Sequence, residues 1–516
     1  MTAMVPVAVA GGGPAGLAAA AELALRGIEC VVLEPRLTVS HRRPRAKTTS
    51  IRTMEHLRRW GVADALRAAA PLPVAWSQRV TFCQTLTGLR ITDFDGAFGL
   101  TTRRDDRFAE PGQQVGQPVF EEVLRSHLRG QRCVSLRLGH AAEALREDDD
   151  GVTLTVRDQA GDRYRLRAAY LIGCDGAGGV VRDQIGARYL GRSDPRPNFN
   201  LVFRAPALDT PLGPAVQYWV VGTPVTGLMG RLDLHGTWWA GFPGVEAEYG
   251  RAHATELITG LIGAPAEQEV LATDPWTARM LVADRFASRR VFLAGESAHV
   301  NPPWGGHGFN TSVGDAVNIA WKLAALLRGW AGPGLLASYE AERRGVVEQT
   351  VASAESNMRS LAGDLPPDAA VIRQAKTPEF HSLGLVLGYS YAGSPAVQPG
   401  VTPAAPADTT CYTPSPRPGA RLPHAWLPDG SSLYDRLGPD FTLLGRRTAA
   451  AGAVSREARE RRIPLTLTEP PPDYPWREEF LLVRPDQHIS GRASDPRDID
   501  LARAVGAGNG NEAGGG

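Results

Sequence analysis

VPVAVAGGGPAGLAAAAELALRGIECVVLEP, residues 5–35, contains a strand, a tight turn, a helix and a second strand in the space of one βαβ unit. The short apolar run 5–10 predicts a buried parallel strand. Residues 15–26 are rich in Ala and Leu at helical period and end at Gly27, a typical helix C-cap. Residues 28–33 form a second apolar run. The stretch therefore predicts an α/β fold that opens with a parallel sheet.

The turn within this stretch has the pattern Gly11-x-Gly13-x-x-Gly16. Gly11 allows the sharp turn, Gly13 lets backbone N–H groups approach a pyrophosphate, and Gly16 permits close helix–strand packing. The positive end of the helix faces the same anion. Glu34 closes the second strand 18 residues after Gly16, where a carboxylate can accept hydrogen bonds from a ribose. The pattern predicts a dinucleotide site; a tight turn without a ligand would use the same glycines.

A second candidate ligand contact lies in AYLIGCDGAGGVVR, residues 169–182. The apolar run 170–172 predicts a strand, and Asp175-Gly176 follows at its end. A carboxylate beside glycines at the carboxyl end of a strand suits a ligand in the crevice of a parallel sheet. An ordinary turn has the same composition, so this segment alone does not decide between a turn and a ligand contact.

GESAHVNPPWGGHGFN, residues 295–310, permits three interpretations. Gly295 to His299 resembles the G-x-S-x-G elbow of a serine hydrolase, but its fifth position is His and no Asp/His partners suggest themselves. Glu296, His299 and His307 are possible metal ligands, but their spacing fits neither a helix nor a strand. The third interpretation is a Pro/Gly loop after a strand, shaped to pass its backbone close to a flat, polyanionic cofactor.

The three motifs follow one another in a fixed order: Gly11-x-Gly13-x-x-Gly16 with Glu34, Asp175-Gly176 with Arg182, and Gly295-Glu296 with Asn310 and Asp315-Ala316. This set resembles the group A flavoprotein aromatic monooxygenases, the p-hydroxybenzoate and phenol hydroxylase relatives that include aromatic-polyketide tailoring hydroxylases. Residues 43–61 and 116–128 look like further family segments. The resemblance covers roughly residues 5–360 and favours the cofactor-loop interpretation of residues 295–310.

The resemblance implies FAD as the cofactor and NADPH or NADH as the electron donor. One oxygen atom of O₂ would pass from a flavin hydroperoxide to an aromatic substrate, phenolic or polycyclic and polyketide-like. Such chemistry needs no serine, cysteine or metal nucleophile, so we expect no metal site. A Baeyer–Villiger oxygenase or a flavin oxidase or decarboxylase could use the same scaffold. A halogenase would need a catalytic lysine, and Lys47 stands in the wrong motif for that role.

The resemblance also assigns roles to individual residues. Glu34 would bind the adenosine ribose, while Arg45 and Gln117 would contact the ribityl and pyrophosphate region. Asp175 would lie beside the cofactor, Glu296 would hold the ribityl chain, and the backbone of the 302–310 loop would line the isoalloxazine. The expected cofactor-binding residues are Gly11, Gly13, Gly16, Glu34, Arg45, Gln117, Asp175, Glu296, Pro303, Gly308 and Asn310.

Two positions depart from the family pattern. The family usually has Asp where Glu296 stands and Ser where Gly179 stands. Glu keeps the charge but adds a methylene, so the loop must shift or a water must intervene. Gly179 removes a hydroxyl near the cofactor. A non-catalytic flavin-binding protein is therefore an alternative from a different functional class.

For catalysis the protein would supply a dry pocket, substrate orientation and electrostatic support. Pro303 would present the loop backbone to the flavin, and His307 would contact the substrate or help to ionise a phenol near neutral pH. The segment 200–243 predicts an antiparallel sheet over the substrate, and period-2 alternation places only some of its aromatic side chains on the inner face. The candidates for substrate contact are Tyr218, Trp219, Trp239 and Phe242.

We expect a Rossmann-like FAD-binding domain, an antiparallel-sheet substrate-binding domain and a C-terminal thioredoxin-like domain. The last domain lacks C-x-x-C, which favours a structural or dimer-supporting role and leaves monomer and homodimer open. Further helices are expected over 53–69, 118–129, 311–327 and 335–361. The expected boundaries are 1–75, 100–185 and 281–375 for the FAD-binding domain, 76–99 and 186–280 for the substrate-binding domain, 376–408 for a linker, 409–505 for the thioredoxin-like domain, and 506–516 for a disordered tail.

Composition excludes several other classes of protein. A net charge of +1 gives no indication of the excess positive charge that is typical of nucleic-acid-binding proteins. Five scattered cysteines without a C-x-x-C pair argue against a disulfide framework and favour a cytoplasmic location. No run of 18 apolar residues occurs, so we expect no membrane span.

Overall fold

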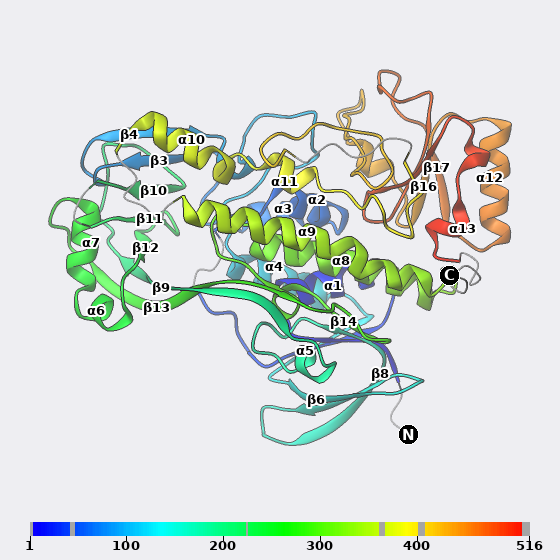
Figure 1. Ribbon diagram of the computed structural model, residues 1–516, viewed down its shortest axis with the longest axis horizontal. Coiled ribbons are helices and arrows are strands. Elements are labelled where there is room, and N and C mark those ends of the chain that lie inside the picture. Colours follow the sequence, from blue (N-terminus) through cyan, green and yellow to red (C-terminus); the bar gives the residue numbers. More distant parts are fainter. Residues whose placement is uncertain (1–3, 42–46, 223–224, 361–366, 401–407, 508–516) are drawn as a thin grey trace.

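Three sheets organise the computed structural model, which describes residues 4–41, 47–222, 225–360, 367–400 and 408–507 (Figure 1). The first sheet has the strand order β5-β2-β1-β8-β7-β6, and β14 pairs with the carboxyl end of β8. Strands β5, β2, β1, β8 and β14 run parallel, whereas β7 and β6 continue the sheet as an antiparallel hairpin. The strands span β1 (Val5–Ala10), β2 (Cys30–Glu34), β5 (Val134–Leu138), β6 (Ala141–Glu147), β7 (Val152–Arg157), β8 (Arg163–Gly173) and β14 (Val291–Leu293).

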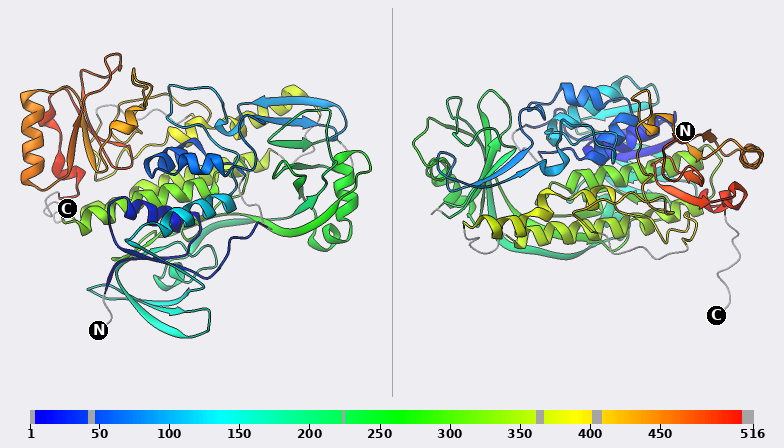
Figure 2. Two further views of the ribbon diagram at one scale, coloured as in Figure 1. Left: turned by 180° about the vertical axis from the view of Figure 1, so that it is seen from behind. Right: turned by 90° about the horizontal axis from the view of Figure 1, so that it is seen from above.

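Helices pack tightly on the first sheet because their contact faces carry small side chains. Helix α1 (Pro14–Ala24) contains four consecutive alanines, Ala18 to Ala21, that are almost fully buried. These short side chains let α1 lie close to α8 (Gly308–Leu327), which runs alongside α9 (Gly334–Arg359) (Figures 1 and 2). Helices α2 (Ile51–Arg59), α3 (Ala63–Ala68), α4 (Gln117–Arg129) and α5 (Val181–Gln184) complete this part of the chain.

The second sheet has the order β15-β13-β9-β12-β11-β10-β3-β4. Its two longest strands, β9 (Tyr189–Arg204) and β13 (Glu269–Ala283), extend from the first sheet to the far end of the second (Figure 1). Helices α6 (Ala247–Ala252) and α7 (Ala254–Ile262) cover one face. The remaining strands are β3 (Arg79–Cys83), β4 (Arg90–Asp95), β10 (Gln217–Val220), β11 (Gly227–Arg231), β12 (Thr237–Pro243) and β15 (His299–Val300).

The third sheet, order β17-β16-β18-β19, lies at the opposite end of the molecule from the second (Figure 2). One parallel and two antiparallel pairings, with α12 packed on the sheet, give the thioredoxin-like arrangement expected from the sequence. The elements are β16 (Phe441–Leu444), α12 (Ala449–Glu460), β17 (Leu465–Thr468), β18 (Phe480–Val483), β19 (Ile489–Ala493) and α13 (Leu501–Ala504).

A buried ion cluster joins the third sheet to the long helices. Arg484, just after β18, donates from Nη1 and Nη2 to the two carboxylate oxygens of Glu342 on α9, at 2.7 and 2.8 Å. Lys322 on α8 donates to the same carboxylate at 2.7 Å. All three side chains are buried, so the cluster stabilises one relative placement of the C-terminal sheet and the helices.

The expected linker over 376–408 is wrong for most of its length. Residues 376–380 complete α10 (Ala369–Phe380), and α11 (Leu383–Leu387) follows. Leu385, Tyr391 and Val397 are buried, so the chain from 367 to 400 packs against the rest of the protein. The segment 401–407 lies outside the described residues, as does the expected tail beyond 507. In the described part of the chain, no helix combines the length and apolarity that crossing a bilayer requires.

Candidate functional site

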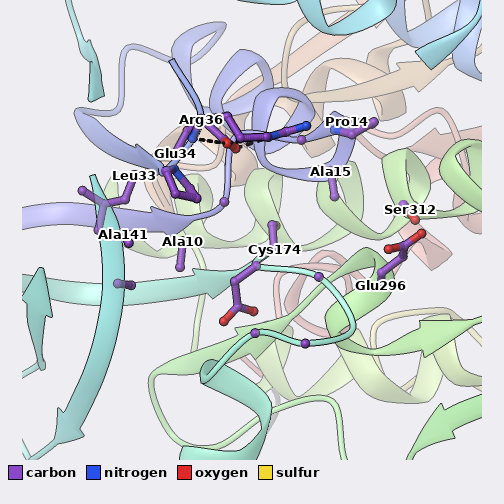
Figure 3. A pocket seen from close by; sticks show the side chains of 18 of the residues that line it. Ala10, Pro14, Ala15, Leu33, Glu34, Arg36, Ala141, Cys174, Glu296 and Ser312 are labelled. Atoms are coloured by element: carbon purple, nitrogen blue, oxygen red, sulfur yellow. Dashed lines mark hydrogen bonds and ion pairs between the residues drawn. The ribbon is translucent and has the colours of Figure 1, made fainter. Parts of the chain in front are cut away.

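A cavity of about 380 Å³ lies where the carboxyl ends of β1, β2, β8 and β14 meet. Parallel pairing brings these four ends to one edge of the sheet, although they are far apart in the sequence. The lining comes from the β1–α1 turn, residues 33–36, residues 174–176 and 178–180, the start of β6, Glu296 and the beginnings of α4 and α8. Figure 3 shows Glu34 with Arg36 at one end and Glu296 beside Ser312 at the other. The three motifs predicted from the sequence therefore share one cavity.

The glycines of the first turn have two separate roles. Gly11 has φ +102°, and a β-carbon there would lie 2.2 Å from the carbonyl oxygen of Cys174. A β-carbon at Gly16 would lie 1.9 Å from the carbonyl oxygen of Gly11. Gly13 has no atom within 4 Å of its β-carbon position. Gly11 and Gly16 thus fix the backbone, while Gly13 keeps open the space in front of the α1 N-terminus, where an anion is favoured.

Glu34 is buried at the end of β2 and is held in place by its hydrogen bonds. One carboxylate oxygen accepts the N–H of Gly12 at 2.8 Å, and the other accepts Nε of Arg36 at 2.7 Å. Burial alone would raise the pKa of Glu34, but its bonds to Arg36 and Gly12 outweigh burial and hold the pKa below its ordinary value. The carboxylate is therefore ionised at neutral pH and can accept further hydroxyl donors.

Gln117 stands at the start of α4 and lines the cavity. Its amide donates to Glu121 at 2.8 Å, and Arg36 reaches the same carboxylate at 3.3 Å. Sequence reasoning missed Arg36, which bridges Glu34 and Glu121. A basic residue two positions after the acidic end of β2 was the available signal. Arg45, predicted to contact the cofactor, lies outside the described residues.

Asp175 connects the second motif to the third. Its Oδ1 accepts the hydroxyl of Ser297 at 2.7 Å, and its Oδ2 accepts the N–H of Val181 at 2.9 Å. Ser297 in turn accepts the N–H of Gly176 at 3.1 Å. A β-carbon at Gly179 would lie 2.0 Å from Cγ of Asp175. The departure from the family pattern at Gly179 therefore makes room for the Asp175 side chain, and Ser297 supplies a hydroxyl to it.

The hydrolase and metal interpretations of residues 295–310 find no support in the contacts of these side chains. Ser297 is bonded to Asp175, and the imidazole of His299 lies 2.7 Å from Oδ2 of Asp315. Arg343 donates to the other oxygen of Asp315 at 2.7 Å in a fully buried cluster. His299 thus has a structural partner on α8. Glu296 is exposed and lines the cavity instead.

The loop before α8 is held by Asn310. The amide of Asn310 donates to the carbonyl oxygens of Gly306 at 2.9 Å and Thr48 at 3.2 Å. Its side-chain oxygen accepts the N–H of Ser50 at 2.9 Å. Gly308 begins α8. The carbonyl oxygen of Pro303, an exposed residue, accepts the N–H of Gly306 at 3.0 Å. These three predicted residues shape the loop, while Phe309 and Ser312 reach the cavity wall.

His307 lies in the same loop but is buried. Burial lowers the pKa of His307 to about 4, so the imidazole is neutral near pH 7. Among the described residues its Nε2 has no hydrogen-bond partner. A neutral ring can accept or donate a single hydrogen bond there, but it does not supply the titration near neutral pH that the sequence suggested.

The second sheet separates the four aromatic residues predicted to contact substrate. Tyr218 and Phe242 belong to the core formed with α7, and the Tyr218 hydroxyl donates to Gly213 at 2.6 Å. Alternation turns Trp219 and Trp239 to the opposite face, where Trp219 is buried against Phe82 and Phe380 and Trp239 is only partly buried. Tyr218 and Phe242 are therefore used in the core on the far face, and substrate contact by the two tryptophans stays a prediction.

A family model described as "FAD binding domain" matches residues 4–354. The chain belongs to this FAD-binding family. A putative polyketide hydroxylase of Streptomyces halstedii is 30% identical, covering 95% of this chain and 94% of that protein. A 2,4-dichlorophenol 6-monooxygenase of Delftia acidovorans is 32% identical over 82% of this chain and 80% of its own. The solved structure of the flavin-dependent monooxygenase PieE with FAD and substrate superposes with a TM-score of 0.87 at 29% identity, covering 98% of both chains.

The protein is accordingly an FAD-dependent aromatic monooxygenase, and FAD is its cofactor. The cavity fits this group. It extends across the ends of β1, β2, β8 and β14, it is open beside Gly13, and it offers an ionised carboxylate at the end of β2. The open space beside Gly13 suits the pyrophosphate of a dinucleotide, and the carboxylate suits its ribose.

Proposed function

We propose that this enzyme hydroxylates a planar, oxygen-bearing aromatic compound, with reduced nicotinamide and O₂ as co-substrates. Relatives act, by their names, on a chlorinated phenol and on a polyketide. The proposal depends above all on the inner face of the second sheet, which carries Trp219, Trp239 and Trp276. Trp276 contacts Trp304 of the loop before α8, with ring centroids 5.6 Å apart. Such a wall of indole rings suits a flat aromatic molecule.

Individual side chains of the cavity would hold FAD. Glu34 would accept the ribose hydroxyls, and the backbone around Gly13 would receive the pyrophosphate. Gln117, Asp175 and Glu296 would contact the remainder of the chain between the two ring systems. Arg45 stays a prediction from the family resemblance.

When bound, FAD supplies the redox chemistry, taking electrons from reduced nicotinamide and activating O₂ for transfer of one oxygen atom to the ring. The protein's own side chains and backbone would position the substrate and enclose the site of reaction. The 302–308 loop, stiffened by two prolines and held by Asn310, would keep water from the reaction and would present its backbone to the ring system. Neutral His307 would hydrogen-bond an uncharged group rather than carry away a phenolic proton at pH 7.

Isotope labelling tests this function. Purified protein with FAD, NADPH and ¹⁸O₂ should convert a member of a panel of phenols and hydroxyanthraquinones into a product that carries one ¹⁸O atom. NADPH consumption should rise when that compound is added. Flavin-bound protein that oxidises no member of the panel, or that releases products without ¹⁸O, would contradict the proposal.

A further inference from the structure

The inner face of the second sheet contains buried hydrogen-bond donors without acceptors. In the described part of the chain, the buried indole N–H groups without a hydrogen-bond partner are those of Trp219, Trp239 and Trp276, and also those of Trp238 and Trp330. Cross-strand pairing places the first three on the inner face, where Trp276 meets the loop before α8, whereas Trp238 lies on the opposite face. Because unpaired indole donors occur on both faces, such a donor indicates a ligand only where a second unmet group lies beside it.

Lys47 adds an amine to this face. The chain has only three lysines, against 53 arginines, and the other two lie beside buried carboxylates. Lys322 pairs with Glu342 at 2.7 Å and Lys376 with Glu379 at 2.8 Å. Among the described residues, Lys47 donates only to the carbonyl oxygen of Val216 and lies 5.8 Å from the ring centroid of Trp239. Its ammonium group therefore has two N–H groups without an acceptor, and no counter-ion, among these residues.

Three polar atoms converge above Gly230. A β-carbon at Gly230 would lie 2.8 Å from the carbonyl oxygen of Val216, 2.9 Å from Nζ of Lys47 and 3.0 Å from Nε1 of Trp239. The glycine thus leaves room for the amine and the indole N–H at the same point. Since the carbonyl is already engaged by Lys47, the unmet groups at this point are both donors.

The backbone places Lys47 between the substrate sheet and the loop before α8. Its neighbour Thr48 gives its carbonyl oxygen to the amide of Asn310 at 3.2 Å. The hydroxyl of Thr48 lies 2.9 Å from the β-carbon position of Gly306. A group bound to Lys47 would therefore belong to a molecule lying between the indole wall and this loop.

We propose that Lys47, together with the indole N–H of Trp239, binds an oxygen anion of the aromatic substrate, either a ring carboxylate or an ionised phenol. The assignment builds on the proposed function and names the charge that the substrate carries. An anion would supply the missing counter-ion and an acceptor for both donors at once. Lys47 acts as a specificity-determining residue, since the uncharged analogue of the substrate would leave the amine unpaired.

Charge on the amine gives the site a pH dependence. Burial lowers the pKa of Lys47 to about 7. No carboxylate or other charged side chain of β10, β11 or β12 faces Lys47 among the described residues. The amine is charged below pH 7 and neutral above it, and a bound anion would shift this balance toward the charged form. Preference for an anionic ligand should therefore decrease as pH rises above 7.

Arg231 provides a matched control on the other face of the same sheet. Its guanidinium lies 4.5 Å from the ring centroid of Trp238 and donates to the carbonyl oxygen of Leu208 at 2.8 Å. Like Lys47, it is a partly buried basic side chain over an indole ring that donates to a backbone carbonyl. The experiment compares Lys47→Met with Arg231→Met in the FAD-bound enzyme. The probes are a dihydroxyanthraquinone carboxylate and its methyl ester, titrated against the flavin absorbance.

Wild-type and Arg231→Met enzymes should bind the carboxylate about thirtyfold more tightly than the ester at pH 6.5, and Lys47→Met should lose this preference. The wild-type preference should also fall between pH 7 and 9. An unchanged ratio in Lys47→Met, a wild type without preference, or a pH-independent ratio would each overturn the assignment. If neither probe binds to flavin-loaded wild type, the proposed substrate class fails, which is a separate result from the failure of Lys47.

Discussion

Replacing Gly179 by serine restores the residue that the family usually has, yet we expect this change to damage the protein. A β-carbon at position 179 would lie 2.0 Å from Cγ of Asp175, so the carboxylate must move. Moving it breaks the hydrogen bonds from Ser297 and from the N–H of Val181, at 2.7 and 2.9 Å. A hydrogen bond to a charged group contributes about 1.5 kcal/mol, so the two together contribute about 3 kcal/mol. If this loss of about 3 kcal/mol falls entirely on the FAD-bound state, the dissociation constant of FAD would rise about 150-fold.

Fluorescence titration of the deflavinated protein with FAD measures this change. Gly345→Ser is the control, because Gly345 is exposed on α9, lies outside the cavity lining, and a β-carbon there meets no atom within 4 Å. Gly345→Ser should bind FAD nearly as the wild type does, whereas Gly179→Ser should bind it at least tenfold more weakly. Equal affinities for the two variants, or tighter binding by Gly179→Ser, would show that the Asp175–Ser297 contact does not support the cofactor site.

Three further changes test other parts of the structure. Glu296→Ala removes a carboxylate from the cavity wall and should weaken FAD about tenfold in the same titration; unchanged affinity would exclude a cofactor contact. His307→Gln should leave the pH profile of turnover between pH 6 and 8 unchanged, because burial lowers the pKa of His307 to about 4. The unfolded imidazole takes up a proton below about pH 6.5, so the wild type should lose stability from pH 6.5 down to 4 in thermal melts, and His307→Gln should lose less. Glu342→Gln leaves the buried Lys322 without a carboxylate partner, while Arg484 keeps Asp486, and should cost about 3–5 kcal/mol, seen as a lower melting temperature, whereas Glu348→Gln at an exposed position of the same helix should have little effect.

The first βαβ unit could be predicted closely because its signals are local. The apolar runs, the glycine turn and the alanine-rich helix each occupy consecutive residues, and the observed elements, Val5–Ala10, Pro14–Ala24 and Cys30–Glu34, end within a few residues of the expected ones. The helix expected over 53–69 is divided into α2 and α3, because Gly61 has φ +74° and ends the first helix. Helical period alone does not reveal such a break.

The parts that could not be predicted depend on tertiary contacts. Alternation shows that Tyr218 and Trp219 point to opposite faces, but the packing partners, α7 for Tyr218 and Phe82 with Phe380 for Trp219, come from distant parts of the chain. The bond between Ser297 and Asp175 joins segments more than 100 residues apart and has no sequence signal. Similarly, the position of Lys47 above Gly230 follows from the packing of the second sheet and has no sequence signal.

The central claim is that FAD occupies the cavity at the ends of β1, β2, β8 and β14, and flavin content of Gly13→Val tests it most directly. A β-carbon at Gly13 meets no protein atom within 4 Å, so the variant should fold and melt as the deflavinated wild type does. The same side chain would fill the space that the pyrophosphate needs. Purified wild type should carry FAD, seen in its visible absorbance, and Gly13→Val should carry none. A Gly13→Val protein that binds FAD as tightly as the wild type would contradict the account.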